Sequence, residues 1–216
     1  DDFTTEKVET MYAIFKNCTS LTSIDLSKFK SNSLKDMSHM FSECTALRSF
    51  TFGPDFTAEK VMTMTHLFEN CISLTSIDLT NFISGDLIDM TYMFYGCTGV
   101  RTITFGSEFT ARKVDNMYQL FKGCLNLKSV DLSRFHPKDL TETAEMFFDC
   151  ISLVQVRFYP KLVLKDMRHM ESMFYGCNNT CFRCVDMRGF EIPENVKVNN
   201  FHTKSNLNII IDENKA

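Results

Sequence analysis

The chain has no tryptophan, only eight glycines and four prolines, and no long apolar run. A bilayer-spanning helix needs roughly 20 consecutive apolar residues, so the sequence predicts no direct membrane insertion. A formal net charge of −4 excludes a general attraction to nucleic acid. The sequence contains no phosphate-cradling glycine loop, no Ser-His-Asp order and no recognisable pair of catalytic carboxylates. These absences argue against an enzyme and predict no cofactor.

Cysteine, in contrast, is abundant, and seven of the nine cysteines are spaced by alternating gaps of 26 and 27 residues. A phenylalanine stands three residues before each of these seven. A fixed period in the range of roughly 20–50 residues indicates a stacked repeat architecture. The chain is therefore predicted to be a solenoid, which presents a long surface to a partner. The in-register cysteines are Cys18, Cys44, Cys71, Cys97, Cys124, Cys150 and Cys177, and their phenylalanines are Phe15, Phe41, Phe68, Phe94, Phe121, Phe147 and Phe174.

Each repeat combines two hydrophobic patterns. Around the phenylalanine, apolar residues recur at the spacing of an amphipathic helix, as in residues 34–41. After the cysteine comes L-x-x-I-x-L, the strand signature of leucine-rich repeats, as in residues 21–26. The sequence therefore predicts an α/β solenoid of about seven helix–strand coils, with a parallel sheet on one face.

A longer period of 53 residues joins the repeats in pairs, because FTTEKV (3–8), FTAEKV (56–61) and FTARKV (109–114) recur at that distance. The extra residue of the longer unit lies between the strand and the next phenylalanine. The unbroken period predicts a single solenoid domain over residues 1–190. Residues 191–216 leave the period and include an apolar run at 207–211, so they are predicted to add a last strand and to cap the final coil.

Cysteine and histidine do not converge on a metal site in the sequence, and none is predicted. The in-register thiols occupy an apolar column and are interpreted as buried and reduced, although bonding between coils is conceivable at a spacing of about 5 Å. Cys177, Cys181 and Cys184 have spacings that suit zinc or a disulfide, and whether they are free or bonded stays open. His39 and His66 are expected to be solvated neighbours that lie too far apart to share a metal.

The outward positions of L-x-x-I-x-L carry ordered charge. An acidic row and a basic row run along the predicted sheet, with hydroxyl side chains between them. This pattern either keeps a flat sheet soluble or forms a polar platform for a protein or a glycan. Tyr92 and Tyr95, on the predicted helix side, form an alternative contact surface. The predicted contact residues of the sheet face are Asp25, Arg48, Asp78, Arg101, Lys128, Asp131 and Arg157.

The units at 14–29, 40–52 and 93–105 resemble the BspA-type leucine-rich repeats, which are also described as a surface repeat of unknown function in mycoplasmas. The resemblance covers about residues 3–190. It implies a right-handed solenoid and a non-enzymatic adhesion or protein-binding module. The implied location is the cell surface or the secreted fraction, and the implied partners are host or neighbouring-cell proteins. It transfers no catalytic or ligand residue.

Two other functions stay open. An intracellular leucine-rich-repeat scaffold would use the same sheet face, and uniformly reduced cysteines favour it. A structural spacer would hold another domain away from a surface. No signal peptide is recognised at Asp1, where the residues are acidic and polar, so we expect either a cytosolic protein or a mature or truncated chain.

Overall fold

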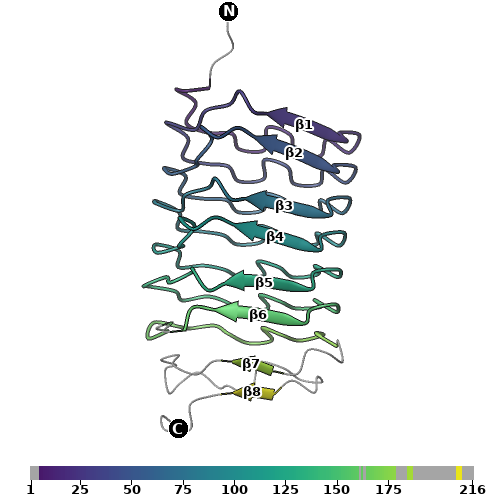
Figure 1. The fold of residues 1–216 in the computed structure, drawn as a ribbon, viewed down its shortest axis with the longest axis vertical. Helices are drawn as coiled ribbons and strands as arrows, with labels where there is room; N and C mark the ends of the chain where they lie inside the picture. Colours follow the sequence, from purple (N-terminus) through teal and green to yellow (C-terminus); the bar gives the residue numbers. More distant parts are fainter. Residues whose placement is uncertain (1–4, 161, 163, 179–183, 187–207, 211–216) are drawn as a thin grey trace, which may run out of the picture.

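The computed structural model describes residues 5–160, 162, 164–178, 184–186 and 208–210. These residues form a column of stacked coils in which short parallel strands lie one below another (Figure 1). None of the described segments is a helix of the length and hydropathy that a membrane crossing requires. The strands are β1 (Ser23–Leu26), β2 (Ser49–Phe52), β3 (Ser76–Leu79), β4 (Thr102–Phe105), β5 (Ser129–Leu132), β6 (Gln155–Phe158), β7 (Cys184–Asp186) and β8 (Asn208–Ile210).

The strands pair in parallel doublets, β1–β2, β3–β4, β5–β6 and β7–β8. Within each of the first three doublets the paired residues are 26 positions apart, as in Ser23 and Ser49. The 27-residue step from Ser49 to Ser76 crosses from one doublet to the next, and no ladder joins β2 to β3 or β4 to β5. The 53-residue period of the sequence therefore corresponds to one strand doublet, and the added residue interrupts the sheet.

The prediction of a helix before each strand is wrong, because the described residues contain no helix. Each apolar stripe folds instead as a string of tight turns. Within residues 37–44, the N–H groups of Met40, Ser42 and Cys44 donate to the carbonyls three residues earlier. The N–H groups of the residues that alternate with them donate to the next coil, as His39 does to Thr65 O at 2.9 Å. Because the helices are absent, the predicted α/β class and the count of about seven helix–strand coils are also wrong. The fold is a parallel-strand solenoid.

Positive φ angles explain why no helix forms. In every repeat the residue two positions before the phenylalanine and the residue two positions after it lie in the left-handed region, as His39 (58°) and Glu43 (63°) do. A right-handed helix needs negative φ at every residue, so these two positions exclude it. A positive φ at the third residue is the feature of type II turns. The turn string leaves alternate N–H groups free to bond the adjacent coil, which a helix would not.

The apolar stripe still forms the core, as predicted. The seven phenylalanines stack with ring centroids 5.1–6.0 Å apart along the column. Beside them, each thiol from Cys44 to Cys177 donates to the carbonyl of the phenylalanine one coil earlier, at 3.0–3.2 Å. All seven in-register thiols are free in the structure. Burial raises the pKa of Cys44 to about 11 and that of Cys177 to about 12, so these thiols stay protonated.

At the C-terminal end, the predicted last strand is confirmed. The apolar run at 207–211 supplies β8, which pairs in parallel with β7. Cys181 and most of the predicted cap at 191–216 lie outside the described residues.

Candidate functional site

The seven predicted contact residues all lie exposed on the strand face. The acids stand on the first strand of each doublet, and their paired positions on the second strand are Thr51, Thr104 and Arg157. The structure joins only one pair of the set, because Arg157 Nη1 lies 3.8 Å from Asp131 Oδ2. Across the described residues no other ion pair links these seven side chains, so Arg48, Arg101 and Lys128 present their charges to solvent.

The acidic row has a structural role that sequence analysis missed. Asp25, Asp78 and Asp131 each accept a hydrogen bond from the N–H two residues later, at 2.8–2.9 Å. This closes the turn that follows the first strand of a doublet, in the manner of an Asx turn. The hydrogen bonds from Ser27 hold the pKa of Asp25 below its ordinary value. The second strands β2 and β4 lead into a different turn, which starts at Gly53 and Gly106 respectively, and they lack the acid.

Two hollows open on the strand face where the sheet is interrupted. The larger, of about 490 Å³, lies between β4 and β5, and the smaller, of about 250 Å³, lies between β2 and β3. Hydroxyl groups, charges and apolar side chains line both of them. The larger is lined in part by Thr104, Ser129, Asp131, Ser133 and Arg134, and the smaller by Thr51, Asp78, Thr80 and Asn81.

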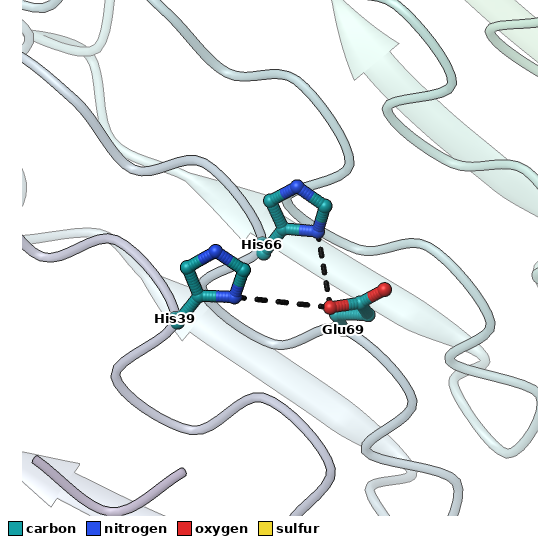
Figure 2. A group of neighbouring side chains, drawn as sticks. All are labelled: His39, His66 and Glu69. Atoms are coloured by element: carbon teal, nitrogen blue, oxygen red, sulfur yellow. Dashed lines mark hydrogen bonds and ion pairs between the residues drawn. The ribbon is translucent and has the colours of Figure 1, made fainter. Parts of the chain in front are cut away.

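On the turn side, His39, His66 and Glu69 come together (Figure 2). His39 and His66 occupy the same position in consecutive coils, and their rings stack with centroids 4.3 Å apart and an angle of 9°. Glu69 Oε2 lies 3.0 Å from His66 Nδ1 and 3.9 Å from His39 Nδ1. The expectation that these histidines lie too far apart to share a metal is therefore wrong.

The three side chains are fixed by their neighbours. Ser42, which is buried, donates its hydroxyl to Glu69 Oε2 at 2.9 Å. The Tyr92 ring stacks on His66 at 4.5 Å, and the edge of Tyr12 meets His39 at 5.6 Å. The hydrogen bond from His66 lowers the pKa of Glu69, and burial lowers the pKa of His39. A carboxylate and a neutral imidazole are both metal donors.

Tyr92 and Tyr95, the predicted alternative contact, are half-buried rather than fully exposed. Their rings meet edge to face at 5.5 Å, and Tyr92 also contacts Tyr118 at 5.4 Å. Tyr92 thus continues the row of stacked rings that begins at His39. The signal that would have found this row is the shared repeat position of His39, His66 and Tyr92, two residues before the phenylalanine.

Comparisons with known proteins return one family. The profile of the family described as "Mycoplasma protein of unknown function, DUF285" matches residues 1–82 and 62–184. A solved leucine-rich repeat protein from Bacteroides ovatus ATCC 8483 is 17% identical, and the alignment covers 93% of this chain and 77% of that one. Its TM-score of 0.22 is too low to carry an argument. No curated protein matches the chain.

Proposed function

The chain belongs to this Mycoplasma-type repeat family of unknown function, and on that premise we propose that it is a non-enzymatic binding module that uses its strand face. The observation that carries the proposal is the exposed, ordered strand face with hollows of mixed polar and apolar lining at the doublet boundaries. A solenoid builds such a continuous surface by stacking, and extended surfaces of this kind serve as binding sites in repeat proteins.

The basic side chains are the charges of this face that no turn engages. Each acid of the acidic row accepts a hydrogen bond that closes its own turn, which fixes its position without cancelling its charge. Arg48 and Arg101 are exposed and stand immediately before the second strands of successive doublets, two coils apart. At the usual strand spacing this separates them by about 10 Å. We therefore propose a partner that carries acidic groups along an extended chain, either an acidic protein segment or an acidic glycan.

The proposed setting is the cell surface or the secreted fraction, with adhesion to a host or neighbouring-cell protein or glycan as the role. This rests on the repeat resemblance. Surface biotinylation of intact cells that express the full-length precursor tests it directly. Labelling of the protein on intact cells supports the proposal, whereas a protein that is labelled only after lysis and fractionates with cytosol favours the intracellular scaffold.

Charge reversal tests the binding face. Arg48→Glu combined with Arg101→Glu should lower the salt concentration at which the protein elutes from immobilised heparin, since ordered charge mainly sets association and salt dependence. Lys7→Glu combined with Lys60→Glu is a matched control, because both lysines are exposed and lie in turns that do not adjoin a strand. Equal elution shifts in the two double variants would mean that net charge alone drives retention.

The turn side is the rival surface, and a kinetic measurement separates it from the strand face. If a partner docks on the tyrosine row, Tyr95→Ala raises the dissociation rate, because truncated aromatic anchors act mainly on residence time. The arginine reversals would then leave association unchanged. The opposite result assigns binding to the strand face.

A further inference from the structure

We propose that His39, His66 and Glu69 bind a divalent transition-metal ion, with Zn²⁺ as the best-suited candidate. One donor atom from each residue lies within 4.8 Å of the other two. Two imidazoles and one carboxylate are a ligand set that zinc accepts, with a fourth position left for water. The inference concerns the turn side of the solenoid and does not depend on the strand-face function.

The donor spacing is close to what a bound ion requires. Zinc bonds of about 2.0–2.2 Å place the donors of a tetrahedral site about 3.4 Å apart. Glu69 Oε2 lies 3.0 Å from one imidazole Nδ1 and 3.9 Å from the other, on either side of that value. Both Nδ1 atoms face the carboxylate (Figure 2). The two imidazole planes lie at only 9° to each other, so each ring must also turn about its side-chain torsions before both Nδ1 lone pairs point at one ion, with the backbone in place.

The backbone holds the two histidines in register. His39 N donates to Thr65 O at 2.9 Å, and His66 N donates to Thr91 O at 3.0 Å, so each histidine is tied to the next coil. Glu69 N donates to His66 O at 3.2 Å, which closes a turn that places both ligands on one side of the chain. A site mounted on such a fixed ladder loses little conformational entropy when the ion binds.

A second set of contacts orients the ligands, as outer-shell groups do in metal sites. The buried hydroxyl of Ser42 holds Glu69 Oε2 at 2.9 Å. Tyr92 and Tyr12 enclose the histidine pair from its two ends. These contacts limit the rotation of both the carboxylate and the imidazoles.

Protons and one lysine compete with the ion. Lys16 Nζ lies 3.4 Å from His39 Nδ1, and its exposed side chain can swing into solvent when the ion enters. Asp36 and Glu69 are the acids that act on His39, whereas His66 and Lys16 repel a proton there. Burial and this repulsion lower the pKa of His39. Metal affinity should fall on acidification, because the ligands must be deprotonated.

The other repeats show what the same positions look like without a metal ligand set. Two coils further along the chain, Gln119 and Lys122 take the positions of His66 and Glu69, and Glu145 takes the position of Gln119 in the following coil. Gln119 and Lys122 both donate to Glu145 Oε2, at 3.0 Å and 2.5 Å, so that carboxylate is paired with a lysine. Among the described residues, the cluster of His39, His66 and Glu69 is the one group of three side chains with metal-binding spacing.

The test is calorimetric titration of the reduced, chelator-treated full chain with ZnCl₂. The wild type should bind a single equivalent that Ser42→Ala weakens by about 10–100-fold and that His39→Ala, His66→Ala and Glu69→Gln each weaken by a larger factor. His136→Ala is the matched control, since that histidine lies outside the cluster and should leave the affinity unchanged. Absence of saturable binding below about 1 mM, or zinc binding that persists in both cluster histidine variants, would overturn the proposal. The latter result would assign the ion to another site, such as the cysteines at 177–184.

A measurement on the wild type alone guards against variants that fail to fold. The chain has five histidines, and with labelled imidazoles Zn²⁺ should perturb the resonances of two of them at substoichiometric concentration. Perturbation of all five together, or of none, would contradict a site at His39 and His66.

Discussion

The change in stability caused by Gly123→Ala distinguishes a turn string from a helix, because the two structures predict changes of opposite sign. In a helix, Gly→Ala raises stability by about 0.8–1.0 kcal/mol. Here Gly123 has a φ of 73°, and an added Cβ would meet its nearest atoms at 3.6 Å and 3.7 Å, so it has room. Only the backbone conformation opposes the substitution, and left-handed alanine costs about 1–2 kcal/mol. The reduced entropy of the unfolded chain returns about 0.4–1 kcal/mol.

The expected net result is a loss of about 1 kcal/mol, or a fall in Tm of about 2–4 °C for a chain of this size. Gly123→Asn should lose less, because asparagine tolerates the left-handed region and Asn17 and Asn70 already occupy the equivalent position with φ angles of 60° and 55°. Thermal denaturation ranks the three proteins as Gly, then Asn, then Ala. A higher Tm for Gly123→Ala, or a helical far-UV circular dichroism spectrum, would refute the turn string.

Three further predictions concern the core, the thiols and pH. Phe94→Ala should cost about 3–5 kcal/mol of unfolding free energy in urea denaturation, because it opens a cavity in the ring stack. Asp78→Ala should cost only about 0.5–1.5 kcal/mol, because it removes the hydrogen bond from the Thr80 N–H. Equal losses would contradict the assignment of Phe94 to the core and Asp78 to the exposed face. Denatured, unreduced protein should titrate at least seven thiols, and three or more disulfides would contradict the buried thiol ladder. The free energy of unfolding should decline as pH falls below about 6.5, because His39 takes up a proton more readily in the unfolded chain than in the folded one. It should decline again below about 4.5, because Glu69 is likewise protonated more readily in the unfolded chain. His39→Ala should flatten the upper part of this profile.

The strands and the core were predictable because both are local to one repeat. The L-x-x-I-x-L pattern alternates inward and outward side chains, and it marks β1 through β6 correctly. The cysteine and phenylalanine columns identify the buried residues irrespective of what backbone carries them. The 53-residue period likewise anticipates the strand doublets, since the added residue falls where the sheet is interrupted.

The helix prediction failed because hydrophobic spacing does not report φ. A string of turns with an inward residue at each third or fourth position buries the same residues as an amphipathic helix. The distinguishing signal was one column further on, two residues after the phenylalanine, where six of seven positions hold residues that tolerate the left-handed region. These are Asn17, Asn70, Gly96, Gly123, Asp149 and Gly176, and the seventh is Glu43. Three glycines in this column are poor helix formers, and together with asparagine and aspartate they indicate turns.

The strand-face contact residues were correctly placed in the open, but the reason for the acids was missed. Asp25-Leu26-Ser27, Asp78-Leu79-Thr80 and Asp131-Leu132-Ser133 share the spacing by which an aspartate accepts from the N–H two residues on. The substitution of these acids on second strands follows from the different turn there. The absence of these acids from second strands is therefore not in itself evidence against a binding role of the strand face.

The contact between His39 and His66 could have been predicted from the repeat period. The coil spacing that was expected to bring in-register sulfurs to about 5 Å applies equally to every other column, because parallel strands repeat at about 4.8 Å. His39 and His66 are 27 residues apart, one repeat, and so they had to be neighbours. Their observed ring spacing of 4.3 Å is that coil spacing, slightly shortened by stacking. Glu69, three residues after His66, follows the same turn geometry that brings its carboxylate to the imidazole at 3.0 Å. In a solenoid of this kind, equivalent positions in adjacent repeats are contacts, and chemistry should be sought down the columns as well as along the chain.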